Sequence, residues 1–110
     1  MQFNYELKDS YTEVKGSGRL NMMAAPKLRE VVAEVVAPGS NRVVVNLEET
    51  MFIDSSGLGA LIGCPKAARQ AGGDLRISGV QPQVRMVLEL TNMGWVLTPY
   101  PTAEAAFGHD

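Results

Sequence analysis

The chain has 110 residues, 45% of them apolar and 20% charged, and a formal net charge of −2. This length suits a single domain over residues 1–110, with room for a disordered tail at about 108–110, and is too short for two domains. The weakly acidic balance, with no Lys/Arg cluster, excludes a typical nucleic-acid-binding protein. One cysteine, Cys64, excludes an internal disulfide. Since no signal peptide or membrane-spanning run is evident, we expect a cytoplasmic protein.

The first two predicted elements are strands. Apolar and polar residues alternate over residues 3–7, which is the pattern of a half-buried strand. A turn at residues 9–10 would return the chain as a second strand over residues 11–15. Gly16 and Gly18 are expected to break that strand.

A helix and a central strand come next. Pro26 suits the first turn of a helix, and apolar residues then recur at helical spacing over residues 28–36. Pro38 and Gly39 cannot continue this helix. The β-branched run at residues 42–47 is apolar on both faces, so we expect a central, parallel strand there.

The most informative segment is residues 52–59, with the sequence Phe-Ile-Asp-Ser-Ser-Gly-Leu-Gly. It places a carboxylate and two hydroxyls at the start of a helix, where unpaired N–H groups favour an anion such as phosphate. If Asp54 caps the helix, both hydroxyls are free; if Ser55 caps it, Ser56 is the freer one. Gly57 and Gly59 are poor helix formers, but their bare backbone would let another protein approach the serines. The segment therefore predicts a serine that is phosphorylated and recognised by a partner.

The rest of the chain continues the alternation of helices and strands. The helix that follows the serines should stop at Gly72 and Gly73, and residues 75–77 should form the next strand. A third helix opens at Pro82 and is closed by Asn92 or Gly94 in a left-handed cap.

The predicted elements end with a short strand at residues 95–97 and a helical turn or two at residues 101–107. This order of elements predicts an α/β domain whose helices cover a mixed sheet.

The serine segment also carries a family resemblance. Asp54-Ser55-Ser56-Gly57-Leu58-Gly59, preceded by Val43-Val44-Val45 and followed by Gln70-Ala71-Gly72-Gly73, resembles the anti-sigma factor antagonist family, whose members are single STAS domains. The resemblance extends over nearly the whole chain. It implies a small mixed sheet packed against about four helices.

The resemblance implies partner switching in bacterial transcription regulation, of the kind used in stress responses. Ser55, the serine directly after the aspartate, would take the phosphate, with Ser56 as the alternative. The unphosphorylated protein would bind an anti-sigma factor that is also a serine kinase, and so free a sigma factor. Phosphorylation would release the protein, and a serine phosphatase would restore it.

The protein would thus be a substrate and not an enzyme. We expect no cofactor, no metal, no direct contact with nucleic acid or membrane, and a monomer or weak homodimer. The residues expected to contact the partner are Asn21, Asp54, Ser55, Ser56, Gly57, Leu58 and Gly59.

The loop before the first helix departs from the family pattern. Relatives commonly carry an aspartate where this chain has Asn21, which either alters partner recognition or serves as a cap or turn residue. For Met22 and Met23 we expect core or loop packing, with an adaptable apolar contact surface as the alternative.

Pro65 lies within the helix that follows the serines. A proline there lacks an N–H and clashes with the carbonyl four residues earlier, so we expect a kink or an interruption near residues 61–65. Cys64 beside it is expected to be a small core residue.

Two other functions compete with the switch. A STAS domain can be a constitutive scaffold subunit of a stress-signalling or lipid-transport complex, in which Ser55 is only part of a binding surface. An enzyme with a serine nucleophile would need a base. However, the one histidine, His109, lies next to the C-terminus, and Lys66 lies beyond Pro65. The Gly-x-Gly segment also lacks the Lys-Ser/Thr of a phosphate-binding loop.

Overall fold

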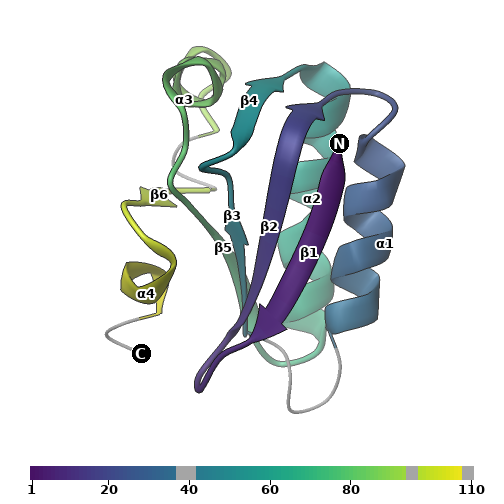
Figure 1. The fold of residues 1–110 in the computed structure, drawn as a ribbon, viewed down its shortest axis with the longest axis vertical. Coiled ribbons are helices and arrows are strands. Elements are labelled where there is room, and N and C mark those ends of the chain that lie inside the picture. Colours follow the sequence, from purple (N-terminus) through teal and green to yellow (C-terminus); the bar gives the residue numbers. More distant parts are fainter. Residues whose placement is uncertain (37–41, 94–96, 108–110) are drawn as a thin grey trace.

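Figure 1 shows the computed structural model of the chain, which describes residues 1–36, 42–93 and 97–107. The elements, in chain order, are β1 (Gln2–Leu7), β2 (Thr12–Leu20), α1 (Ala25–Val35), β3 (Arg42–Asn46), β4 (Thr50–Ile53), α2 (Ser55–Gln70), β5 (Asp74–Ser78), α3 (Pro82–Leu90), β6 (Pro99–Tyr100) and α4 (Ala103–Ala106).

The described strands form one mixed sheet in the order β1-β2-β3-β5-β6, and β4 pairs with the end of β2. β1 runs antiparallel to β2, and the other pairings are parallel. β3 lies between two neighbours, and Val43, Val44 and Val45 are fully buried. The predicted α/β class and the central, parallel strand are therefore confirmed.

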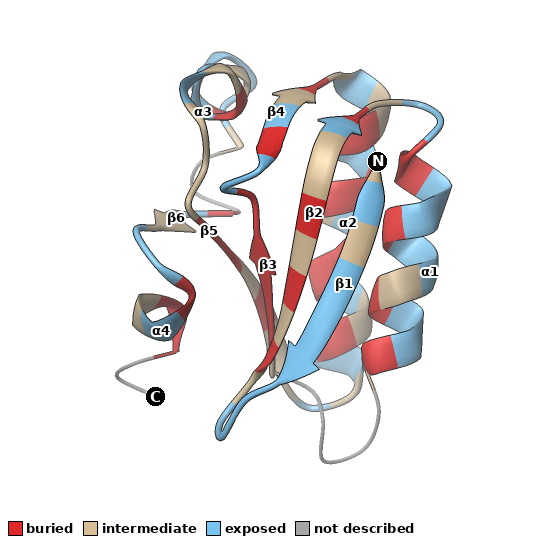
Figure 2. Cartoon of the chain, viewed as in Figure 1, coloured by how far each residue is buried: buried red, intermediate tan, exposed pale blue. Residues whose placement is uncertain are grey.

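Helices cover the two faces of the sheet unequally (Figures 1 and 2). α1 and α2 pack on one face, where Val14, Leu28, Leu61 and Ile77 belong to the main core. On the other face, the short α4 and Phe107 form a smaller cluster with Val44.

The sequence-based end of the second strand is wrong, because β2 continues through both glycines to Leu20. At Gly16 a Cβ would lie 2.6 Å from the terminal methyl of Met1 and 2.9 Å from the ring of Phe3. Glycine there makes room for side chains of the neighbouring strand. Gly18 has a φ of +117° and lies at the irregularity where β2 pairs with β4. Both glycines therefore shape a continuous strand.

The structure contains two strands that the sequence pattern did not predict. Residues 50–53 form β4, directly before the serine segment. The final strand is Pro99–Tyr100, two residues after the end of the predicted one. Residues 95 and 96 of the predicted strand lie outside the described residues.

The interruption expected near Pro65 does not occur, because α2 is one continuous helix from Ser55 to Gln70. The kink, which was the other expectation, stays a prediction. The predicted stop is confirmed. Gly72 has a φ of +90°, and the Gly73 N–H donates to the Ala68 carbonyl at 2.9 Å, as in a Schellman motif.

The predicted left-handed cap of α3 is also confirmed, at the first of its two candidate residues. Asn92 has a φ of +61°, and the Met93 N–H donates to the Leu88 carbonyl at 2.9 Å. The other candidate, Gly94, lies outside the described residues.

Candidate functional site

Asp54 is the residue that caps α2. Its backbone is extended, with φ −111° and ψ −175°, and its Oδ1 accepts the Gly57 N–H at 2.8 Å. Its main-chain carbonyl accepts the Leu58 N–H, also at 2.8 Å. The choice that the sequence left open is thereby decided, since the carboxylate and not a serine hydroxyl binds the free N–H of the first turn.

Ser55 and Ser56 occupy the first two positions of α2. Ser55 is exposed and Ser56 is half-buried. Among the described residues neither hydroxyl has a hydrogen-bond partner. The Ser55 hydroxyl is thus open to solvent at the positive end of a sixteen-residue helix.

The two glycines of the serine segment have different surroundings. A Cβ on Gly57 would lie 2.0 Å from the Leu20 carbonyl oxygen, so only glycine fits there. A Cβ on the exposed Gly59 would have no neighbour within 4 Å. Leu58 is 7% exposed and packs in the main core. Of these predicted contact residues, Gly59 lies at the surface. Gly57 and Leu58 are buried, so they can influence a partner only by positioning the exposed residues beside them.

The residue before the cap, Ile53, is held from two sides. It pairs with Leu20 of β2, and the Asp54 N–H donates to the Leu20 carbonyl at 3.3 Å. On its other side the Gln83 side chain accepts the Ile53 N–H at 3.0 Å and donates to the Ile53 carbonyl at 3.2 Å. Gln83 therefore covers the edge of β4 as a neighbouring strand would. No local sequence pattern predicts this contact, because the two residues lie thirty positions apart.

The loop that starts at Asn21 lies beside this strand end, since Leu20 directly precedes it. Asn21 Oδ1 accepts the N–H groups of Met23, at 3.0 Å, and Ala24, at 3.1 Å. The interpretation of Asn21 as a turn residue is therefore confirmed. The packing predicted for Met22 and Met23 is wrong, because their side chains are 68% and 75% exposed.

Lys66, one of the two candidate bases, is not placed to serve the serines. Lys66 follows Ser55 by eleven positions along α2, about 16 Å at ~1.5 Å per residue. His109 lies outside the described residues. Burial raises the pKa of the Cys64 thiol to about 11, so it stays protonated at neutral pH. The described residues include no group of three or more His, Cys, Asp or Glu side chains that could hold a metal ion.

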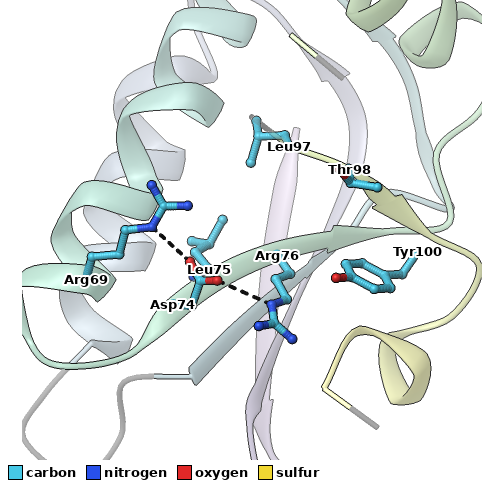
Figure 3. A pocket seen from close by; sticks show the side chains of 7 residues that line it. All are labelled: Arg69, Asp74, Leu75, Arg76, Leu97, Thr98 and Tyr100. Carbon is cyan, nitrogen blue, oxygen red and sulfur yellow. Dashed lines mark hydrogen bonds and ion pairs between the residues drawn. The ribbon is translucent and has the colours of Figure 1, made fainter. Parts of the chain in front are cut away.

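A polar cavity of about 160 Å³ lies at the opposite end of α2 (Figure 3). Arg69 Nε donates to Asp74 Oδ1 at 3.1 Å, and Arg76 Nε donates to Asp74 Oδ2 at 3.3 Å. The Arg76 guanidinium also lies 4.3 Å from the centroid of the Phe107 ring and donates to the Ala106 carbonyl at 2.6 Å. These contacts join α2, β5 and the α4 region, which indicates a structural role.

The fold and the site define the class of protein: a small α/β domain of the STAS type, with an exposed serine at a capped helix start. The model of the STAS domain family matches residues 2–106, and the chain belongs to this family. Within the described ranges, none of the helices combines the length and apolarity that crossing a bilayer requires.

Relatives and solved structures agree with this assignment. The anti-sigma-B factor antagonist of Staphylococcus aureus is 35% identical over 95 residues, which cover 84% of this chain and 88% of the relative. An anti-sigma factor antagonist from Mycobacterium paratuberculosis matches with a TM-score of 0.84 and 26% identity, over 97% of this chain and 91% of that chain. The phosphorylated form of SpoIIAA, a Bacillus cell fate determinant, has a TM-score of 0.70 and covers 97% of both chains. Its 22% identity supports the fold alone.

Proposed function

We propose that this chain is an anti-sigma factor antagonist controlled by phosphorylation of Ser55. The observation that carries the proposal is the exposed Ser55 hydroxyl, directly after a helix cap that is already supplied by Asp54. It occurs in a STAS domain that is 35% identical to an anti-sigma-B factor antagonist. The partner is an anti-sigma factor with serine kinase activity, and a serine phosphatase reverses the modification.

Exposure favours Ser55 over Ser56 as the modified residue. A kinase must bring the γ-phosphate of ATP in line with the attacking hydroxyl, so the serine has to enter the kinase active site. Ser55 is exposed, whereas Ser56 is half-buried. Phosphorylation of Ser55 therefore needs no local unfolding of α2.

The free protein tolerates the phosphate. The group adds about −1.5 to −2 charges, and the helix start stabilises a negative charge by roughly 0.3–1 kcal/mol. The Asp54 carboxylate on the preceding residue opposes this, because like charges repel, by about 1 kcal/mol for two unit charges ~4 Å apart in water and less with salt screening. These opposing effects are of similar size, so the fold remains intact.

In a complex the balance changes. A phosphate buried in the interface loses its water, and an unpaired buried charge raises the free energy by roughly 2–5 kcal/mol or more. This corresponds to binding that is about 30-fold to several-thousand-fold weaker. The effect in the complex exceeds the effect in the free protein, so phosphorylation acts as a switch without refolding the domain.

A quantitative pull-down from the source cell's lysate tests the proposal. The baits are wild type, Ser55→Ala and Ser55→Asp, with equal folding checked by circular dichroism. Ser10→Asp is the matched control, because Ser10 is an exposed serine in the connection between β1 and β2. We expect wild type, Ser55→Ala and Ser10→Asp to capture an ATP-binding anti-sigma factor, and Ser55→Asp to lose it.

Equal capture of the same partners by all baits, repeated with a bait that carries phosphoserine at position 55, contradicts the switch. That result would instead support a constitutive scaffold. The phosphoserine bait is required because aspartate carries less charge than a phosphate.

A further inference from the structure

Two consecutive methionines in the loop between β2 and α1 are left in solvent. Met22 is 68% exposed and Met23 is 75% exposed. Methionine is a flexible apolar residue that normally fills gaps in a core. Neighbouring exposed apolar side chains mark contact sites on many proteins. This pair is therefore a candidate contact site and not part of the core.

The loop presents these side chains in a defined conformation. Asn21 Oδ1 accepts the N–H groups of Met23 and Ala24, and the Asn21 carbonyl accepts those of Ala24, at 3.1 Å, and Ala25, at 2.9 Å. Ala24 and Ala25 are buried at the start of α1. Both ends of the loop are thus fixed, and the methionines project from a turn that hydrogen bonds hold in place.

The methionine loop and the serine segment follow the paired ends of two strands. Leu20, two residues before Met22, pairs with Ile53 and accepts the Asp54 N–H. Figure 1 shows the ends of β2 and β4 and the starts of α1 and α2 at the same end of the molecule. The strand contact therefore joins the loop directly to the start of α2.

We propose that Met22 and Met23 are the apolar anchor of the anti-sigma factor interface, and that their burial strengthens the phosphate switch at Ser55. This inference rests on the proposed function. The partner must present an apolar surface that the two thioethers can enter. When they enter, water is excluded beside Ser55, and a charge there becomes more costly to bury.

The test is calorimetric titration with each purified serine-kinase anti-sigma factor of the source organism. The proteins are wild type and Met22→Ser/Met23→Ser, each with serine and with phosphoserine at position 55. Leu7→Ser is the matched control, because Leu7 is 74% exposed and pairs with Thr12 at the far end of the nine-residue β2, on the order of 25 Å away.

We expect the double methionine variant to bind about 10- to 100-fold more weakly than wild type, and the Leu7 variant to bind as wild type does. The ratio between unmodified and phosphorylated protein should also shrink in the methionine variant. Both variants should keep the wild-type circular dichroism spectrum, because all three side chains are exposed.

The possible failures are distinguishable. If wild type binds, phosphoserine weakens binding and the methionine variant behaves as wild type, this inference is overturned and the proposed function stands. If wild type binds none of the anti-sigma factors, the proposed function is overturned and this inference with it. If sedimentation shows a wild-type dimer that Met22→Ser/Met23→Ser abolishes, the pair belongs to a self-contact and the inference is also overturned.

Discussion

The two ends of α2 differ in how their side chains are used. At the carboxyl end, Arg69 and Arg76 share the carboxylate of Asp74, and the Arg76 guanidinium packs on an aromatic ring. At the amino end, the Ser55 hydroxyl has no partner among the described residues, and Met22 and Met23 nearby are exposed. At the carboxyl end the polar side chains pair with each other within the domain. At the amino end an unpaired hydroxyl and two exposed apolar side chains remain.

Whether a side chain already has partners within the domain therefore distinguishes structural residues from candidate functional ones better than its chemical type does. Two arginines beside a cavity resemble an anion site, yet their contacts connect helices and strands of the same chain (Figure 3). At the other end, even Asp54 is occupied as a cap. What remains for a partner is a serine and an apolar loop. Substitutions at the two ends should differ in their effect on stability, from a large effect at Gly57 to a small one at Arg69.

Gly57→Ala should cause the largest loss of stability. The new methyl would lie 2.0 Å from the Leu20 carbonyl oxygen, so α2 or β2 must move, and we expect the free energy of unfolding to fall by about 3 kcal/mol. Gly59→Ala is the matched control, because its methyl points into open space and should stabilise the helix by up to ~1 kcal/mol. Urea unfolding followed by circular dichroism measures both. Similar effects at the two positions would disprove the close approach at Gly57.

Gln83→Ala should come next. It leaves the partly buried N–H and C=O of Ile53 without their side-chain partner, and we expect a loss of about 1–2 kcal/mol. Amide hydrogen exchange should speed up more at Ile53 than at Val45 in β3, which is fully buried and exchanges through global unfolding. An unchanged exchange rate at Ile53 would mean that the Gln83 contact does not protect the strand edge.

Asp54→Ala removes the cap and should lower the free energy of unfolding by about 1 kcal/mol. Asp54→Asn is the control, since asparagine caps helices about as well as aspartate. The same denaturation series measures both variants. If Asp54→Asn is as unstable as Asp54→Ala, the contribution of Asp54 comes from its charge and not from its hydrogen bond.

Arg69→Ala should have the smallest effect. Its pair with Asp74 is largely exposed, and exposed ion pairs contribute roughly 0–1 kcal/mol. We expect a change below about 0.5 kcal/mol and no change in binding to the anti-sigma factor. A large loss of binding in a folded Arg69→Ala protein would show that the carboxyl end of α2 also belongs to the interface.

Local patterns in the sequence predicted much of this molecule. The alternation of helices and strands, the central run at residues 42–47 and the stop at Gly72 follow from hydrophobic periodicity and cap chemistry. The predicted helix start at the serines is also correct, and Asp54 proved to be one of its two candidate caps.

The differences came from contacts between distant residues. Glycine usually breaks a strand, and the local sequence around Gly16 does not reveal that Met1 and Phe3 pack over it. The clamp of Gln83 on Ile53 and the fit of Gly57 against Leu20 also join segments more than twenty-five positions apart. Residue type favours packing for Met22 and Met23, whereas both side chains are exposed in the hydrogen-bonded turn that begins at Asn21.

The phosphate switch is tested most directly by the affinity of one purified anti-sigma factor for this protein with serine and with phosphoserine at position 55. We expect the phosphoprotein to bind at least about 30-fold more weakly, with the same circular dichroism spectrum and thermal unfolding curve. Equal affinity of the two forms, or a phosphoprotein that has lost its fold, would contradict the switch.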